Sequence, residues 1–235
     1  MEQQWDYFSR NSGTKPEDVH KQLHDAHAAA RAGRYEEALD GYIWFHENSE
    51  NVPGLGGVRL SFALSYWVNL GRVYPPARTA LEEIRDRKTK TILNGFRDLA
   101  SFHDVVSINT HLGCERATYE LFVTLNSSSP ALAGAYSALA LPAIVSNGDF
   151  HLARQFLPPP SEEPQRLAEM FKRMNEAVDL QTCIHLYVRD VNIILETLRG
   201  VGDLNQANQV YASALDSFES PQVREAVRLA LDGPK

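Results

Sequence analysis

The fold class follows first from one stretch of the chain, Gly33–Tyr42, which reads GRYEEALDGY. A helix that ends at Gly33 can close with a left-handed residue, because glycine has no Cβ atom to obstruct that conformation. Two residues later, Tyr35 is expected to pack over the turn. Ala38 is small enough to let two antiparallel helices approach to about 8–10 Å, and Tyr42 then fills the gap to the next hairpin. The stretch therefore predicts a helical hairpin.

The same pattern returns along the chain. Its clearest copy begins at Gly202 with GDLNQA and continues to Tyr211 and Ala214. Weaker copies combine a glycine with an alanine and a large side chain: Gly148 with Phe150 and Ala153, Gly113 with Ala117 and Leu121, and Gly71 with Ala77 and Leu81. A single hairpin cannot bury its apolar face alone, so neighbouring hairpins are expected to stack.

Helical signals also mark both ends of the chain. Thr14 and Glu17 have the spacing of a capping box, and a helix should run on from there to Ala32. A closing helix is expected between Pro221 and Gly233, because apolar residues recur there at helical spacing: Val223, Ala226, Val227, Ala230 and Leu231. These patterns predict helices at the beginning and the end of the fold.

Strand signals are poor throughout the sequence. No stretch shows a sustained alternation of apolar and polar residues, and Asn94-Gly95 and Asn147-Gly148 lie between helical patterns, as helix ends do. The longest apolar stretch, Ala131–Val145, is shorter than the roughly 20 residues of a membrane span and is interrupted by Pro142. We therefore expect an all-α fold with a buried helix at this position.

The hairpin units at Gly33 and Gly202 resemble the second half of a tetratricopeptide repeat, and the likeness extends unevenly over residues 16–218. The resemblance implies antiparallel helical hairpins stacked as a right-handed superhelix, an α-α solenoid. It also implies a non-catalytic module that binds a peptide or a partner protein in a concave groove. Leu23 and Ser61 stand where the family has a lysine that clamps carboxyl-terminal tails, so binding of such tails is not expected.

The resemblance also places the groove residues, counted from each anchor glycine. In the last repeat they are Arg189, Asn192, Glu196 and Arg199, beside an apolar face of Ile184, Tyr187, Val188, Val191, Ile194 and Leu195. The other units contribute His103, Ser107 and Thr110, then Ser61 and Ser65, and finally His27. The alternative interpretation is that these residues form ordinary solvated helix faces, and sequence alone leaves both open.

The chain is expected to have four parts. An aromatic segment at 1–15 contains Trp5, Tyr7 and Phe8, and it precedes repeats at 16–157. A proline-rich connector at 158–162 leads to C-terminal helices at 163–235, where a helix is expected from about Asp179 to Arg199. Before it, an apolar helix stripe is formed by Leu167, Met170, Phe171, Met174 and Val178. We favour one continuous domain over a separate sub-bundle at 161–235. The aromatic segment should pack on its own domain, although docking on a partner or in a homodimer is an alternative.

Composition limits the class of partner. The formal net charge of -7 argues against nucleic-acid binding, which needs a basic face to neutralise phosphates. Residues 1–6 lack the basic start and apolar core of a secretory signal, and no stretch predicts membrane binding. Cys114 and Cys183 are the two cysteines, and their wide separation favours free thiols in a reducing compartment. These features together predict a cytoplasmic protein.

Few residues suggest chemistry. His20, His24 and His27 share a helix face and are weak candidates for a metal site, although the simpler interpretation is a polar stripe. No catalytic pattern is matched by the histidines that lie near a cysteine or an aspartate in the sequence: His111 near Cys114, His185 near Cys183, and His103 beside Asp104. The glycines of Gly54–Gly57 lack the strand and the Lys-Ser/Thr of a phosphate-binding loop, and we expect a flexible connection there. No enzyme activity and no cofactor are predicted.

Three functions remain as hypotheses. The first, which we favour, is the protein-binding module that the resemblance implies. The second is an acidic protein of the immunity or antitoxin type that masks one basic toxic partner, since complementary charge speeds association. The third is an enzyme with a pocket near the irregular joint at 158–185.

Overall fold

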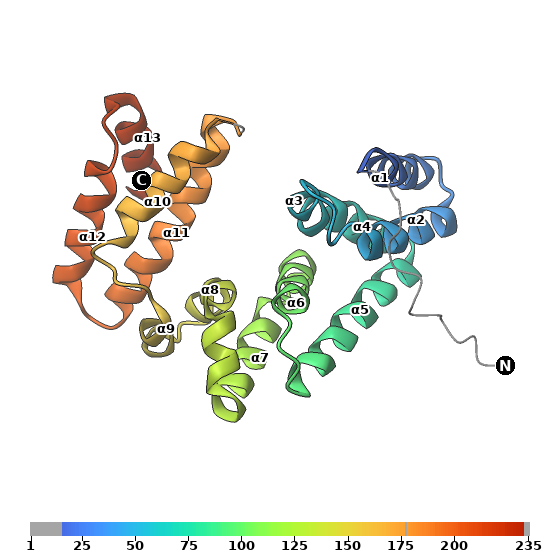
Figure 1. Cartoon of the computed structure of the whole chain (residues 1–235), viewed down its shortest axis with the longest axis horizontal. Coiled ribbons are helices and arrows are strands. Elements are labelled where there is room, and N and C mark those ends of the chain that lie inside the picture. Colours follow the sequence, from blue (N-terminus) through green and yellow to red (C-terminus); the bar gives the residue numbers. More distant parts are fainter. Residues whose placement is uncertain (1–15, 177, 233–235) are drawn as a thin grey trace. The chain divides into compact units, whose positions relative to one another are not determined.

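The computed structural model describes residues 16–176 and 178–232, and every regular element in these ranges is a helix (Figure 1). This confirms the all-α class. The aromatic segment at 1–15, the capping residue Thr14 and the terminal Gly233 lie outside the described residues. Within the described ranges, no helix is both long enough and apolar enough to cross a membrane.

The helices form two compact units, Met1–Cys114 and Glu115–Lys235. The first unit contains α1 (Pro16–Arg31), α2 (Tyr35–Asn48), α3 (Gly56–Leu60), α4 (Phe62–Val73), α5 (Pro75–Leu93) and α6 (Leu99–Leu112). The second contains α7 (Glu115–Ser128), α8 (Pro130–Ser146), α9 (Phe150–Phe156), α10 (Glu163–Met174), α11 (Leu180–Gly200), α12 (Leu204–Asp216) and α13 (Pro221–Asp232).

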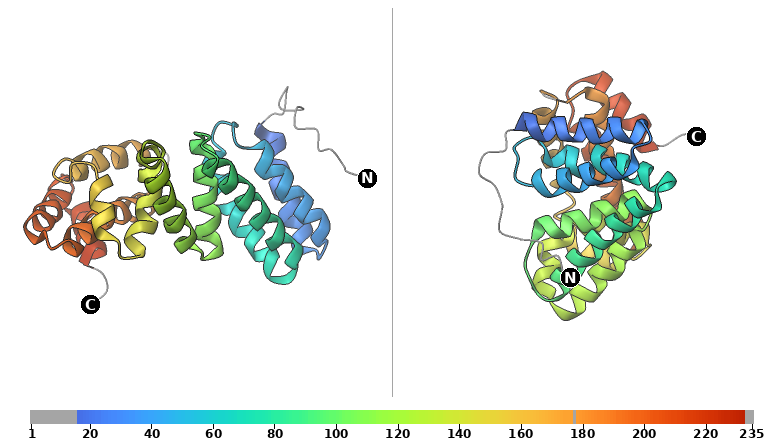
Figure 2. Two further views of the ribbon diagram at one scale, coloured as in Figure 1. Left: turned by 90° about the horizontal axis from the view of Figure 1, so that it is seen from below. Right: turned by 90° about the vertical axis from the view of Figure 1, so that its right-hand side faces the viewer.

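In the first unit, two helices pack on the hairpin before them. Helix α4 packs against both α1 and α2, and α6 packs against both α4 and α5 (Figure 2). Helices α1 and α2 approach so closely that a Cβ atom at Gly41 would lie 2.6 Å from the Cβ of Ala26. The centre of the unit is Trp67, which is buried and donates from Nε1 to the carbonyl of Ala77 at 2.7 Å.

Most of the expected helix ends are correct. Gly33, Gly95, Gly113, Gly148 and Gly202 all have a positive φ. Two of these glycines are followed by an aspartate that caps the next helix: Asp149 accepts from the backbone N–H of Leu152, and Asp203 from that of Gln206, each at 3.1 Å. Glycine and aspartate therefore end one helix and begin the next, which makes a tight turn.

Gly71 is the exception, because the expectation that it ends a helix is wrong. Helix α4 continues through Gly71 to Val73, and the chain turns at Tyr74, just before the proline that begins α5. The glycine serves close packing instead. A Cβ atom at this position would lie 3.0 Å from the Cβ of Arg78 and 3.2 Å from its backbone nitrogen.

The second unit stacks helices in the same way and adds one. Helix α8 packs against α7 and α9, and α11 packs against α8, α9 and α12. The additional helix, α10, packs on α11 and α12 through an aromatic cluster in which Phe171 and Tyr187 both meet Phe218, with ring centroids 5.0 and 4.9 Å from its own. Helix α13 packs on α11 and α12, at the position expected for a closing helix.

Details of the second unit differ from expectation in two places. Met170 belongs to the predicted apolar stripe of α10 but is exposed, whereas Leu167 and Phe171 are buried. Ala117 was expected to lie in a hairpin contact, but it is exposed and its neighbour Thr118 is buried instead. The predicted helix beginning near Asp179 is present, with Asp179 accepting from the backbone N–H of Thr182 at 2.9 Å.

Candidate functional site

The predicted groove residues of the first unit lie on three helices. His27 is on α1, Ser65 is on α4, and three further residues follow one another along α6: His103, Ser107 and Thr110. Ser61 lies between α3 and α4, and its hydroxyl donates to the carbonyl of Gly57 at 2.5 Å. Ser61 therefore stabilises the end of α3. The sequence did not predict this helix, because it begins within Gly54–Gly57, where we expected a flexible connection.

One contact joins the predicted residues of α1 to α4. The ring of His27 stacks on that of Tyr66, with centroids 4.0 Å apart, and its Nδ1 atom lies 3.5 Å from the hydroxyl of Tyr42. Burial, together with the nearby charge of Arg31, lowers the pKa of His27 below its ordinary value. His27 is thus a neutral ring between helices at neutral pH.

An exposed aromatic side chain lies beside Ser65. Phe62 is 64% exposed, three residues before Ser65 on α4, so the two share one face of the helix. On α6, Leu99 precedes His103 by one turn and is 54% exposed, which adds an apolar residue to that row as well. The rows on α4 and α6 therefore combine polar groups with exposed apolar ones.

The row on α11 belongs to the second unit. Arg189, Glu196 and Arg199 are exposed and Asn192 is half-buried, whereas all six residues of the predicted apolar face are buried. The guanidinium of Arg189 pairs with its sequence neighbour Asp190 at 2.8 Å. The two-faced character of this helix is confirmed, and its use as a binding surface stays a prediction.

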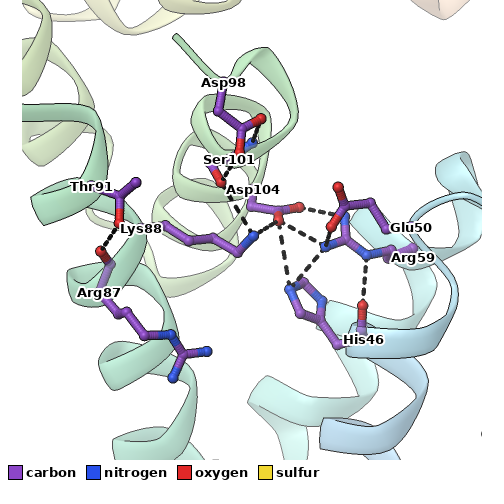
Figure 3. A network of polar contacts seen from close by, with 9 residues as sticks. All are labelled: His46, Glu50, Arg59, Arg87, Lys88, Thr91, Asp98, Ser101 and Asp104. Atoms are coloured by element: carbon purple, nitrogen blue, oxygen red, sulfur yellow. Dashed lines mark hydrogen bonds and ion pairs between the residues drawn. The ribbon is translucent and has the colours of Figure 1, made fainter. Parts of the chain in front are cut away.

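A buried polar network lies inside the first unit and was not predicted (Figure 3). Asp104 on α6 is fully buried and receives two hydrogen bonds from the guanidinium of Arg59 on α3, of which the one from Nη2 measures 2.7 Å. The ammonium of Lys88 on α5 lies 2.7 Å from the same carboxylate. One carboxylate therefore ties three helices together.

Arg59 extends the network to α2. Its Nε donates to the carbonyl of His46 at 2.9 Å, which satisfies an acceptor in the last turn of α2, where the final carbonyls have no donor within the helix. Its Nη2 lies 3.2 Å from Nε2 of His46. A guanidinium can only donate, so Nε2 accepts and the imidazole is neutral.

The titration of these groups fits their geometry. Burial, and then the charge of Arg59, lowers the pKa of His46 to about 3. Burial alone would raise the pKa of Asp104, but the hydrogen bond and charge of Arg59, with Lys88, outweigh it and hold that pKa below its usual value. The network thus contains an ionised Asp104 and a neutral His46 at neutral pH. We interpret it as a structural clamp.

The residues considered for chemistry do not come together. His24 is exposed, with its side chain 3.7 Å from that of Asp25, and His27 faces Tyr66 instead of the other histidines. Among the described residues, no group of three histidine, cysteine or acidic side chains could hold a metal ion. His111 lies 2.8 Å from the carbonyl of Ser107 through Nδ1, while the thiol of Cys114 donates to the carbonyl of Leu112.

The joint at 158–185 carries a shallow hollow. It has a volume of about 320 Å³, is open to solvent, and is lined by Arg166, Met170, Arg173 and Met174. A larger open hollow of about 780 Å³ lies on α1 and α2, where Trp44 and Tyr35 stand among acidic side chains. The four residues that line the smaller hollow, two arginines and two methionines, include neither a nucleophile nor a general base.

Sequence reasoning missed Phe62, Tyr66 and the buried network. Phe62 could have been found from its spacing, because it precedes Ser65 by three residues. It is the one aromatic residue that helical spacing places on the same face as Ser65. Asp104 could have been found from its place among Ser101, Phe102, Val105 and Ile108, which form the buried face of α6. Its partners could not, because Arg59 and Lys88 are distant in sequence and no pattern pairs them with Asp104.

Comparison with known proteins finds no matching family model, no matching curated protein and no matching solved structure.

Proposed function

We propose that this chain is a non-catalytic protein-binding module, and that its partner lies along the rows of predicted groove residues on α1, α4 and α6. The hairpins would stack in the manner of tetratricopeptide repeats, so that the first helix of each hairpin faces one common surface. The row on α11 would play the same part in the second unit. This proposal keeps the groove residues named from the sequence and adds Phe62 and Leu99 to them.

The packing order of the first unit carries the proposal. Because α4 packs on both helices of the preceding hairpin and α6 does the same, the packing supports the proposal that α1, α4 and α6 occupy equivalent places in successive layers. The stacking of His27 on Tyr66 supports this, since it joins α1 and α4 beside Ser65. An extended partner could therefore cross several helices through equivalent positions.

The composition of the rows also supports binding. Phe62 is an exposed aromatic residue on the same helix face as Ser65, and exposed aromatic residues are frequent energetic anchors of protein interfaces. The polar neighbours Ser65, His103, Ser107 and Thr110 can fix the register of a partner by hydrogen bonds without a large entropic cost. The rows thus offer an anchor and a set of short polar contacts.

Partner capture from native extract tests the proposal with two matched pairs of variants. Phe62→Ala is compared with Trp44→Ala, and Thr110→Glu with Thr79→Glu, because each pair alters an exposed residue of the same type inside and outside the rows. Both threonine hydroxyls also bond to the carbonyl four residues earlier. Losing an anchor should weaken a partner by about 2 kcal/mol, or roughly thirtyfold.

We expect the Phe62 and Thr110 variants to lose a captured protein that the Trp44 and Thr79 variants retain, with circular dichroism showing all four folded. Equal retention by all four variants would refute the choice of surface. Absence of any specific partner for the wild type would refute the binding function itself. A single partner held far more tightly than a micromolar complex would favour the masking hypothesis over a general scaffold.

A further inference from the structure

A second surface of the first unit combines basic and apolar side chains where α5 ends and α6 begins. It consists of Arg87, Lys90, Leu93, Phe96, Arg97 and Leu99, and we refer to it as the basic–apolar corner. All six residues are exposed, and the three apolar ones are 47%, 65% and 54% exposed in chain order. Such a concentration is unexpected in a chain whose net charge is -7.

The cations of the corner differ from the other basic residues of α5. Arg78 and Arg85 pair with the acidic side chains of Glu82 and Asp86, and Lys88 is held by Asp104. Among the residues that the structure describes, Arg87, Lys90 and Arg97 have no ion-pair partner. Figure 3 shows the guanidinium of Arg87 pointing away from the network around Lys88.

The backbone of the corner is connected to the buried network by hydrogen bonds and an ion pair. The ammonium of Lys88, between Arg87 and Lys90 on α5, bonds to Asp104 and lies 3.5 Å from the hydroxyl of Ser101. That hydroxyl donates to Asp98 at 2.6 Å, and Asp98 caps α6 directly before Leu99. The turn between α5 and α6 contains Gly95, whose φ is +87°. The side chains of the corner therefore stand on a backbone that needs little ordering when a partner binds.

We propose that the basic–apolar corner docks an acidic segment of a partner protein that carries apolar anchor residues. Carboxylates of the segment would pair with Arg87, Lys90 and Arg97, while its apolar side chains would cover Leu93 and Leu99. The inference rests on the proposed protein-binding function and adds the chemistry of the partner. It concerns a different surface from the row of Phe62 and Ser65 on α4, although Leu99 belongs both to the corner and to the row on α6.

Charge complementarity favours such a segment over an anionic membrane. Three cations contribute about 1 kcal/mol each at an anionic lipid surface, which is little for stable attachment. A flat membrane would also meet the acidic residues beside the corner, of which Glu83 and Asp86 lie one helical turn before Arg87 and Lys90. A peptide segment can contact the corner alone, and screening over about 8 Å at physiological salt weakens the effect on it of the more distant negative charges of the chain.

The test measures binding of a synthetic fluorescent peptide that alternates Glu with Leu and Phe to the full chain. The peptide is compared with a version in which Gln replaces Glu, and with vesicles of phosphatidylcholine and phosphatidylserine. The protein variants are Arg87→Glu/Lys90→Glu and Leu93→Ser/Leu99→Ser. The control variant, Arg31→Glu/Arg72→Glu, makes the same change of net charge at two exposed residues of the same unit.

We expect the acidic peptide to bind the wild type and the control variant within about twofold of each other, and each corner variant at least about tenfold more weakly, with a dependence on salt. Equal binding of the Gln peptide, equal loss in the control variant, or attachment to vesicles without binding of the acidic peptide would overturn the inference. If this peptide fails while Phe62→Ala still loses a captured partner, the corner is refuted and the proposed function stands.

Discussion

Asp104 shows how a single buried charge can hold several helices. Its carboxylate has no solvent contact, and it is tolerated because Arg59 and Lys88 supply opposite charges and hydrogen bonds at short range. A buried ion pair of this kind adds little net stability compared with apolar residues of the same size. Its contribution is to fix which helices meet, since removing one partner leaves a charge buried without compensation.

The neutral His46 leads to a prediction for the pH dependence of stability. Its pKa of about 3 in the folded chain lies below the ordinary value of 6.5, so between these values the unfolded chain binds the proton and the folded chain does not. Stability must therefore fall as the pH is lowered through 6.5 towards 3. Each pH unit in this window costs at most about 1.4 kcal/mol for this one proton.

Chemical denaturation at pH 7.5 and pH 5 measures this effect against His46→Gln, whose amide oxygen can still accept from Arg59. We expect the free energy of unfolding of the wild type to fall more steeply towards pH 5 than that of the variant. Asp104 does not interfere, because its pKa lies below its usual value and its contribution is lost only at lower pH. Parallel pH profiles for the two proteins would contradict a depressed pKa at His46.

At the residue scale, the sequence indicated which side chains are exposed better than it indicated which side chains contact one another. In the polar row predicted on α11, Arg189, Glu196 and Arg199 are exposed and Asn192 is half-buried. Asp104 was considered only beside its neighbour His103, because pairing by adjacency is all that a single sequence offers. Its true partner Arg59 lies in a glycine-rich connection that gave no sign of a buried cation.

At the scale of the element, glycine has two distinct uses in this chain. Gly202 and its equivalents end helices with a positive φ, and their sequence context reveals this. Gly71 and Gly200 instead lie within helices and admit a neighbour. Spacing alone does not separate the two uses, which explains why Gly71 was wrongly predicted as a helix end. The position of helix α10 in the fold was harder to predict. It is set by the packing of α10 on α11 and α12, which the sequence does not reveal.

Gly200 provides a prediction at this scale. A Cβ atom there would lie 2.1 Å from the ring of Phe150, so Gly200→Ala must displace that ring. We expect a loss of about 1–2 kcal/mol in the free energy of unfolding, because the strain of overpacking exceeds the gain of about 1 kcal/mol in helix propensity.

Gly134→Ala is the matched control for this substitution. Gly134 lies inside α8 with no atom within 4 Å of an added Cβ, so alanine should stabilise the chain by up to about 1 kcal/mol. Urea denaturation of both variants measures the difference. If Gly200→Ala proved as stabilising as Gly134→Ala, the close packing of α9 against α11 would be contradicted.

At the scale of the whole molecule, the chain divides between Cys114 and Glu115. Sequence placed its clearest irregularity at the prolines 158–160, because a run of prolines is visible and a boundary between ordinary helices is not. The boundary falls just after Gly113, so the predicted hairpin around this glycine contributes α6 to one unit and α7 to the other. The order of packing within each unit is what connects the fold to the proposed binding rows.

The most direct test of binding through these rows is site-specific photo-crosslinking in native extract. A photoreactive amino acid is placed at Ser65 or Glu196, which are exposed on α4 and α11, and at Glu47 or Asn208 as controls that are exposed on α2 and α12. We predict adducts with a specific partner from Ser65 and Glu196 and none from the controls. Adducts from the control positions alone, or from no position, would contradict a binding surface on the rows.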